Sequence, residues 1–133
     1  MAYYLDTSAL VKLVVAEPET APLRAWWREQ GGTPVASDLV RTELMRAVRR
    51  AVPEAAVQAH AVLDALVLLQ VSSRVLDVAG RLEPATLLSL DAIHLATALE
   101  LGDELEGVVT YDDRLAEAAV AYGVPVVMPS SAA

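Results

Sequence analysis

The sequence contains no cysteine, which excludes disulfide bonds, thiolate nucleophiles and thiolate zinc sites. It also lacks any apolar run that approaches the roughly 20 residues of a membrane-spanning helix. The longest such run, residues 65–71, includes Gln70 and directly follows Asp64. No basic segment precedes an apolar one at the N-terminus, which argues against a signal peptide. These absences predict a cytoplasmic protein that has no membrane segment.

Positive charge is scarce, because only ten residues are basic, Lys12 is the only lysine, and the formal net charge is −8. Residues 1–50 hold seven basic and six acidic residues, whereas residues 51–133 hold three and twelve. A uniformly acidic protein repels nucleic acid, but cations bound between carboxylates offset part of that charge. The charge therefore neither excludes nor indicates a nucleic acid substrate.

The length and the apolar content indicate one compact domain. The chain has 133 residues, of which 55% are hydrophobic, and its mean hydropathy is +0.40. One domain over residues 1–133 is the expectation for this length. The apolar content is high for a small domain, so we expect a well-filled core and an apolar surface that a partner covers.

Short apolar stretches alternate with segments of helical pattern. The pattern predicts strands at residues 3–5, 34–36, 68–71, 107–110 and 125–128, the last at an edge of the sheet. It predicts helices at residues 8–15, 21–29, 39–50, 53–67, 73–80, 89–100 and 113–122. Ser37 or Asp38 is the expected N-cap of the helix at 39–50. Alternation of this kind predicts an α/β fold with a mainly parallel sheet of about five strands.

Three aspartates lie where strands end or helices begin. Asp6 ends the first strand, Asp91 lies in the first turn of a helix, and Asp112 follows the fourth strand by two residues. In a parallel sheet these positions share one edge, where ligands bind, so the three carboxylates are predicted to meet there. For each aspartate taken alone, helix capping is the better explanation of the position.

Glu43 lies inside a predicted helix, where it caps nothing. An ion pair with Arg46 or Arg50 on the helix surface is one explanation. The other is that Glu43 joins the three aspartates, because several carboxylates with few other ligands suit one or two Mg²⁺ or Mn²⁺ ions. Such ions activate water and stabilise the leaving oxygen in phosphodiester hydrolysis, so no histidine base is needed.

Each of the four acids belongs to a longer segment. The segments are Asp6-Thr7-Ser8-Ala9-Leu10, Thr42-Glu43-Leu44 with Arg46-Ala47, Asp91-Ala92-Ile93-His94-Leu95-Ala96-Thr97-Ala98, and Thr110-Tyr111-Asp112 with Arg114-Leu115-Ala116. They resemble the PIN domain, and more closely the VapC ribonuclease toxins of prokaryotic toxin–antitoxin pairs. All four acidic motifs occur in the expected order, and the resemblance covers essentially the whole chain.

The resemblance implies a three-layer α/β/α fold, with helices on both faces of a central parallel sheet. It implies endonucleolytic cleavage of RNA by water that Mg²⁺ or Mn²⁺ activates. The catalytic and metal-binding residues would be Asp6, Glu43, Asp91 and Asp112. It also implies a homodimer and a cognate antitoxin that inserts a segment near the active site.

Several polar residues stand next to these acids in the sequence. The hydroxyl groups of Thr7 and Thr110 are candidates to hold the carboxylates or a water on the metal, whereas Ser8 is interpreted as a turn or cap residue. His94, one turn after Asp91 in an otherwise apolar helix, is interpreted as a hydrogen-bonded packing residue rather than as a base.

Arg46 shares a helical face with Glu43, so it is a candidate to bind a substrate phosphate or to orient that carboxylate. An exposed ion pair is its alternative role. Asp112 matches the acidic motif and is the expected metal ligand, while its neighbour Asp113 is the expected helix cap. The remaining arginines of residues 24–50 form either a phosphate-binding rim or an ordinary solvated helix face.

Other functions remain open at this stage. A PIN-like scaffold could bind metal without turnover. A phosphotransferase could use Asp6 as its nucleophile, as haloacid dehalogenase-like enzymes do, but Ser8 stands where those enzymes commonly have an acid. A receiver-like switch normally has a lysine after its last strand region, and Lys12 is far from that position.

Overall fold

The computed structural model describes residues 1–131, and its sheet has five strands in the order β3-β2-β1-β4-β5, all of them parallel. The strands are β1 (Ala2–Leu5), β2 (Thr33–Ser37), β3 (Val67–Leu69), β4 (Leu105–Val109) and β5 (Val126–Val127). The chain moves outward from the central β1 through β2 and β3, then returns to the other side of β1 for β4 and β5. The predicted parallel sheet and the edge position of the last strand are confirmed.

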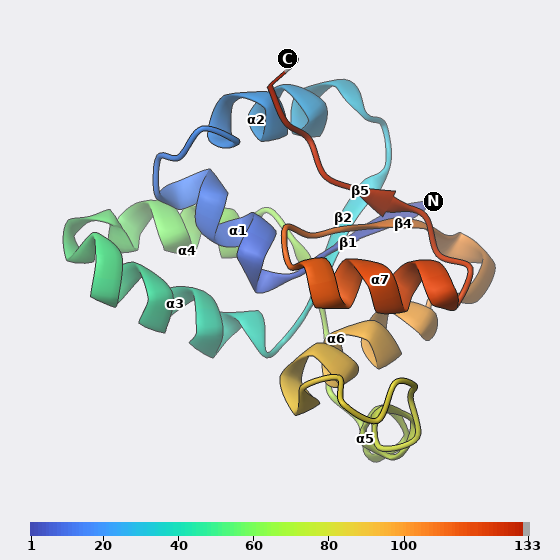
Figure 1. Ribbon diagram of the computed structural model, residues 1–133. Helices are drawn as coiled ribbons and strands as arrows, with labels where there is room; N and C mark the ends of the chain where they lie inside the picture. The colour runs from blue at the N-terminus through green and yellow to red at the C-terminus, as the bar shows by residue number, and fades with distance from the viewer. Residues whose placement is uncertain (132–133) are drawn as a thin grey trace.

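Helices cover both faces of the sheet (Figure 1). They are α1 (Thr7–Val14), α2 (Thr20–Glu29), α3 (Val40–Ala51), α4 (Ala56–Asp64), α5 (Ser73–Ala79), α6 (Ser89–Leu99) and α7 (Asp113–Ala121), with short 3₁₀ turns at Pro53–Ala55 and Gly102–Glu104. Helices α1 to α4 pack on one face, α6 and α7 pack on the other, and α5 packs against α6. This is the expected three-layer α/β/α fold. Among residues 1–131, no helix is long and apolar enough to cross a membrane.

Neighbouring residues of the inner strands point to opposite faces of the sheet. Tyr4 and Val108 lie in the core beneath α6 and α7, whereas Leu5 and Val109 lie in the core beneath α1 to α4. All four side chains are fully buried or nearly so. A parallel strand between two helical layers needs apolar residues on both faces, which explains the short continuous apolar runs. The inner strands are thus fixed from both sides.

The helix predicted over residues 53–67 is wrong at its C-terminal end. It consists of a 3₁₀ turn and α4, which ends at Asp64, and Val67 begins strand β3. Val67–Leu69 pairs in parallel with Val35–Ser37 of β2. These apolar residues fit a helix or a strand by local pattern, and the free edge of β2 decides between the two.

The expected N-cap of α3 is also wrong. Helix α3 begins at Val40, and its N-cap residue Leu39 makes no side-chain cap. Ser37 is the last residue of β2, and its Oγ accepts a hydrogen bond from the Leu39 N–H at 3.1 Å. The hydroxyl therefore supports the turn between strand and helix rather than the first turn of the helix.

We predict that Leu44→Ala lowers the free energy of unfolding by about 2–5 kcal/mol, because Leu44 is fully buried in the core beneath α1 to α4. Leu76→Ala, the same substitution at a side chain that is 47% exposed, should cost much less. Urea unfolding of the two variants and the wild type measures the difference. Equal losses would contradict the description of this core.

Candidate active site

The carboxyl ends of β1 and β4 form the place where the strand order reverses. The chain leaves β1 toward β2 on one side and later returns to β4 on the other. Asp6 directly follows β1, and its backbone N–H donates to the Val109 carbonyl at the end of β4 at 3.3 Å. Such switch points are the usual ligand sites of open α/β sheets, because the adjoining connections diverge and leave a crevice.

Asp6 is buried at this point, with 4% of its surface exposed. Its Oδ1 accepts hydrogen bonds from the Ser8 hydroxyl at 2.7 Å and from the Ala9 N–H at 3.1 Å, so Asp6 is the N-cap of α1. Its Oδ2 accepts from the Thr110 hydroxyl at 2.7 Å. Burial raises the pKa of Asp6 above its ordinary value, and these hydrogen bonds only partly oppose the effect.

The hydroxyl groups of Ser8 and Thr110 join the start of α1 to the end of β4. Besides donating to Asp6, the Ser8 Oγ accepts from the Tyr111 N–H at 2.9 Å. The Thr110 Oγ1 accepts from the Asp112 N–H at 3.0 Å. Thr110 is therefore placed as predicted, in contact with a site carboxylate. Ser8 was interpreted as a turn or cap residue, but it links two segments that are 103 residues apart in sequence.

Glu43 lies near the start of α3 and is held by two donors. Its Oε1 accepts from the Thr7 hydroxyl at 2.8 Å, and the Nε2 atom of His94 lies 2.7 Å from the same oxygen. Burial alone would raise the pKa of Glu43, but the hydrogen bonds from His94 and Thr7 outweigh it and hold the pKa below its ordinary value. Among residues 1–131, neither Arg46 nor Arg50 forms an ion pair with Glu43.

Asp91, in the first turn of α6, is the residue at which the four acids influence one another. Burial raises the pKa of Asp91, and the negative charges of Asp112 and Asp6 raise it further. His94 opposes this shift, and Glu43 adds to it. The carboxylates of four distant segments therefore lie within electrostatic range at one edge of the sheet. Asp91 itself accepts no hydrogen bond from the residues that the structure describes.

Asp112, rather than Asp113, is the N-cap of α7. The Asp112 Oδ1 accepts from the backbone N–H groups of Arg114 at 2.9 Å and Leu115 at 3.3 Å. The expectation that Asp113 caps the helix is wrong, because Asp113 is already the first helical residue and its side chain is exposed. The N-cap is the residue before the helix, and here it is Asp112, which has extended backbone angles (φ −88°, ψ 112°).

The chemistry of these donors fits a hard divalent cation. All four side chains offer carboxylate oxygens, and their mutual repulsion at Asp91 is the kind that a bound cation relieves. Within residues 1–131, however, no three acidic or histidine side chains stand together in a ready-made metal site. Several of their oxygens are instead turned toward protein donors, as at Asp6 and Glu43. An ion would therefore bind through oxygens that accept no protein hydrogen bond, such as the Oε2 of Glu43, and other carboxylates of the site would have to rotate toward it.

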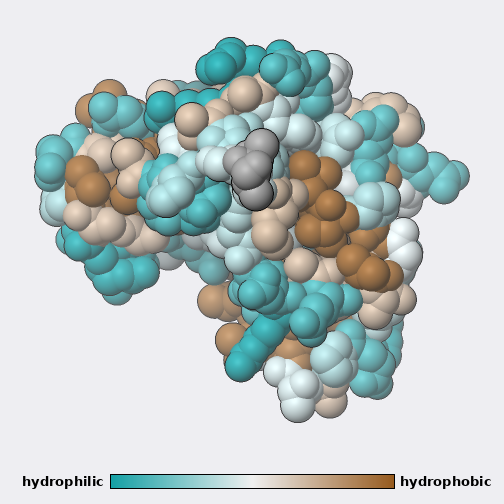
Figure 2. Space-filling model, turned by 45° about the horizontal axis from the view of Figure 1, so that its top comes forward, coloured by the Kyte–Doolittle hydropathy of each residue, from teal (hydrophilic) through white to brown (hydrophobic). Residues whose placement is uncertain are grey.

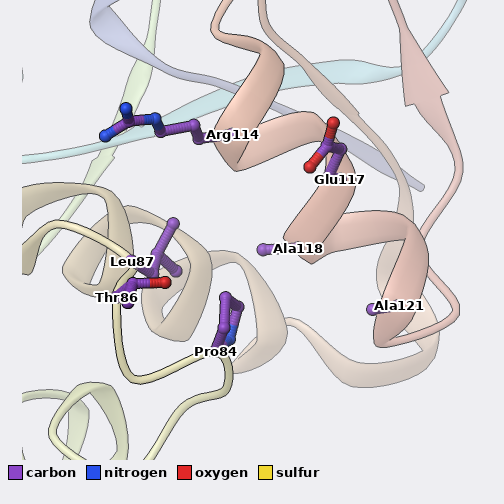
Figure 3. Close-up of a pocket in the computed structure, with 7 residues that line it drawn as sticks. All are labelled: Pro84, Thr86, Leu87, Arg114, Glu117, Ala118 and Ala121. Carbon is purple, nitrogen blue, oxygen red and sulfur yellow. The ribbon is translucent and has the colours of Figure 1, made fainter.

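A hollow of about 420 Å³ lies beside the acids rather than between them. Figure 3 shows it between α7 and the loop before α6, with the Thr86 hydroxyl directed into the space. Arg114 extends from α7 away from Glu117, and no ion pair joins the two. None of the four acids lines the hollow, but Arg114 follows Asp112 by two residues, so the hollow adjoins the acidic site along α7.

The arginines of residues 24–50 divide into separate groups. Arg46, Arg49 and Arg50 on α3 line one hollow of about 230 Å³ and form no ion pair within residues 1–131. Arg24 and Arg28 line a different hollow between α2 and α4. A single phosphate-binding rim of all these residues is therefore not formed, but the three arginines of α3 follow Glu43 along the same helix.

The sheet is parallel, is covered by helices on both faces, and has one buried and three partly buried acids at its carboxyl edge. These features define an α/β protein with an acidic site at that edge. The family model of the PIN domain matches residues 3–121, so the chain belongs to the PIN-domain family. Two curated relatives are from Mycobacterium tuberculosis. Ribonuclease VapC46 is 48% identical over 97% of this chain and 98% of its own. Ribonuclease VapC47 is 47% identical over 84% of this chain and 85% of its own.

Solved structures confirm the fold. The crystal structure of VapC20 from Mycobacterium tuberculosis, a toxin that cleaves the sarcin–ricin loop, has a TM-score of 0.77 at 19% identity. It covers 96% of this chain and 99% of its own. A toxin–antitoxin complex from Klebsiella pneumoniae has a TM-score of 0.73 at 19% identity, over 98% of this chain and 99% of its own. The arrangement of layers is thus shared with chains of very different sequence.

The sequence did not predict the contacts that two residues, His94 and Tyr4, make at the site. His94 is a buried, hydrogen-bonded residue, as predicted, but its partner is the site residue Glu43. Tyr4 was read only as part of a strand, yet its hydroxyl lies 2.7 Å from the Nδ1 of His94. The spacing of Asp91 and His94, one helical turn apart, was the only sequence signal for this contact.

We predict that Asp91→Asn raises the melting temperature of the metal-free protein at pH 7. Because the pKa of Asp91 is higher in the folded state than in the unfolded state, the folded protein holds the carboxyl proton more tightly. Folding stability therefore falls as the pH rises from the unfolded-state pKa to the folded-state pKa. The amide removes this penalty without the loss of a hydrogen bond. The gain should vanish below the ordinary pKa of 3.8, where the carboxyl is protonated in both states.

Calorimetry in EDTA at several pH values measures the effect, with Asp77→Asn, at an exposed position of α5, as the control. An Asp91→Asn protein that melts at or below the wild-type temperature at pH 7 would refute the proposed repulsion.

Proposed function

We propose that this protein is an endoribonuclease of the VapC type and the toxin of a toxin–antitoxin pair, with Asp6, Glu43, Asp91 and Asp112 as its catalytic and metal-binding residues. The observation that carries the proposal is the convergence of these acids on the switch point between β1 and β4. Relatives named ribonucleases, with 40–48% identity over nearly the full chain or most of it, support the reaction class. We take residues 1–133 as one such domain.

The proposed reaction is hydrolysis of an RNA phosphodiester. A Mg²⁺ or Mn²⁺ ion, held by the four carboxylates, would supply positive charge that stabilises the reacting phosphate and lowers the pKa of the attacking water. The water oxygen bonds to phosphorus and the bond to the 3′ oxygen breaks, which leaves a 5′-phosphate and a 3′-hydroxyl. Thr7 and Thr110 position the carboxylates of Glu43 and Asp6 through the contacts described above.

Asp91 is the acid whose oxygens are most available to bind the ion. It accepts no hydrogen bond from the described residues, whereas both oxygens of Asp6 do. Burial and neighbouring charge raise the pKa of Asp91 in the metal-free protein, and a bound cation would oppose that shift.

The state of Asp6 disfavours the phosphotransferase alternative. Asp6, which would be the nucleophile, is almost fully buried, and both of its oxygens accept hydrogen bonds.

The arginines of α3 offer a surface for the RNA backbone. Arg46, Arg49 and Arg50 line a hollow to which only arginines contribute. They lie on the helix that carries Glu43, in a protein whose net charge is −8, so the local positive charge adjoins the acidic site. Guanidinium groups bind phosphates in this way and position the strand without reading its sequence. Arg46 therefore serves substrate binding rather than the orientation of Glu43.

The proposal includes a homodimer, a cognate antitoxin and a cytoplasmic location, where RNA substrates are found. Some hydrophobic side chains are exposed, among them Leu76, Leu88 and Leu90 of the α5–α6 region, and a second protomer would cover such residues. On the face shown in Figure 2, hydrophobic surface is confined to patches among hydrophilic residues. The hollow of about 300 Å³ that includes Trp27 and Val62 offers the antitoxin a mixed apolar and basic surface.

We predict that the purified protein, free of antitoxin, cuts RNA in Mn²⁺ or Mg²⁺ and is inactive in EDTA. Asp6→Asn should lower the rate at least about 100-fold, because loss of a ligand exceeds the 10–100-fold effect typical of residues behind the ligands. Asp103→Asn, an exposed aspartate at the amino edge of the sheet, should retain the wild-type rate.

Mapping of the new ends should give 5′-phosphates. If the wild type binds Mn²⁺ but cuts neither RNA nor single-stranded DNA, the protein is the metal-binding scaffold instead.

We predict that Arg49→Ala weakens RNA binding and lowers the slope of log affinity against log salt by about 0.7–1, because one phosphate contact is lost. Arg81→Ala, an exposed arginine after α5, should leave both the affinity and the slope unchanged. Fluorescence anisotropy in the Asp6→Asn background measures binding without cleavage. Equal effects of the two substitutions would contradict a specific role for the α3 hollow.

A further inference from the structure

A chain of hydrogen bonds runs from the core of the sheet to Glu43. The hydroxyl of Tyr4 on β1 lies 2.7 Å from the Nδ1 of His94 on α6, and the Nε2 of His94 lies 2.7 Å from the Oε1 of Glu43 on α3. Tyr4 is fully buried and His94 is 3% exposed, whereas Glu43 is half-buried. The chain joins three elements that are remote in sequence and ends at a carboxylate of the proposed active site.

The chemistry of the partners fixes the direction of these hydrogen bonds. A carboxylate only accepts, so the Nε2 of His94 must carry the proton that is donated to Glu43. In the neutral ring Nδ1 is then an acceptor, and it takes the proton of the Tyr4 hydroxyl. Burial raises the pKa of Tyr4, so this phenol keeps its proton at any physiological pH. Both nitrogens of His94 are thereby engaged, which leaves no free nitrogen for a base.

The consequence for Glu43 is that one of its oxygens is fixed. Its Oε1 is shared by His94 and Thr7, whereas its Oε2 accepts no hydrogen bond from the described residues. A glutamate side chain loses much rotamer freedom when it is ordered. The two donors to Oε1 already order the side chain in the ligand-free protein, and they leave Oε2 available to bind a ligand.

We propose that His94 is a positioning residue for Glu43, held in the required tautomer by Tyr4, so that the carboxylate is oriented toward the acidic site before it binds an ion or substrate. This inference rests on the proposed function. Residues behind metal ligands commonly act in this way, because a hydrogen bond that orients a ligand also fixes its charge. Its position beneath Asp91, one turn along α6, places His94 beside a second site carboxylate as well.

Two amide substitutions separate the two hydrogen bonds of His94. The amide of Gln reaches the position of Nε2, so His94→Gln keeps a donor for Glu43 and loses the acceptor for Tyr4. The amide of Asn reaches only the position of Nδ1, so His94→Asn keeps the acceptor for Tyr4 and loses the donor for Glu43. Both replacements are neutral and polar, and thermal unfolding checks that each variant is folded.

The first readout is the affinity for Mn²⁺ alone, measured by calorimetry or electron paramagnetic resonance. We expect His94→Asn to weaken it by about 10-fold or more and His94→Gln to stay close to the wild type. In the cleavage assay, His94→Asn should lower kcat and leave the KM for RNA unchanged, because the arginine surface is intact. A His94→Asn protein that matches the wild type, or a His94→Gln protein that is equally impaired, overturns the inference.

The second readout is the tautomer, which needs neither metal nor activity. Long-range ¹H–¹⁵N spectra of the metal-free wild type should place the proton on Nε2 of His94. Tyr4→Phe removes one of the two partners that favour this tautomer, so a share of the form protonated on Nδ1 should appear, and Mn²⁺ binding should weaken in the same direction as in His94→Asn. A proton on Nδ1 in the wild type, or an unchanged tautomer in Tyr4→Phe, overturns the role of Tyr4.

The two proposals fail in different ways. A wild type that binds Mn²⁺ but cuts no RNA overturns the ribonuclease function alone, and the Mn²⁺ affinities of the two His94 variants still decide the positioning role. A wild type that cuts RNA with unchanged kcat and Mn²⁺ affinity in His94→Asn overturns the positioning role alone. A wild type that binds no Mn²⁺ overturns both.

Discussion

The buried carboxylate of Asp6 is the constraint on which the site depends. It stands between β1 and β4 with 4% of its surface exposed, and a charge in such a place persists only when it is hydrogen-bonded. Ser8, Ala9 and Thr110 supply those bonds and thereby fix the start of α1 against the end of β4. The same bonds that satisfy the carboxylate also set the geometry of the edge at which the other acids arrive.

The repulsion among the acids at this edge disfavours the folded state and favours binding of a cation. Burial and like charge raise the pKa of Asp91, which means that its ionised form is less stable in the folded protein than in the unfolded chain. Proteins tolerate such sites where function requires them and compensate elsewhere. Here the compensation is the double apolar core, which fixes the inner strands from both faces. A bound cation would reverse the sign of the interaction, since it converts repelling carboxylates into ligands.

Two of the four acids are both helix N-caps and residues of the proposed site. Asp6 caps α1 and Asp112 caps α7, so the local explanation of each residue is correct and does not compete with the functional one. Asp91 and Glu43 cap nothing and are placed by other means, Glu43 through Thr7 and the buried pair of His94 and Tyr4. An aspartate at the start of a helix is therefore weak evidence for a functional site, because capping also explains it. A glutamate inside a helix, such as Glu43, is stronger evidence.

The sequence by itself determined the elements, the parallel sheet and the positions of the acids, because periodicity and the ends of apolar runs are local properties. It placed the third strand at residues 68–71 but assigned Val67 to the preceding helix, and the free edge of β2 decides where this strand begins. The strand order, which brings Asp6 beside Thr110, and the contact of His94 with Glu43 also came only from the tertiary structure. These contacts join residues 51 and 104 positions apart, and no local pattern encodes which distant partner a buried polar group finds.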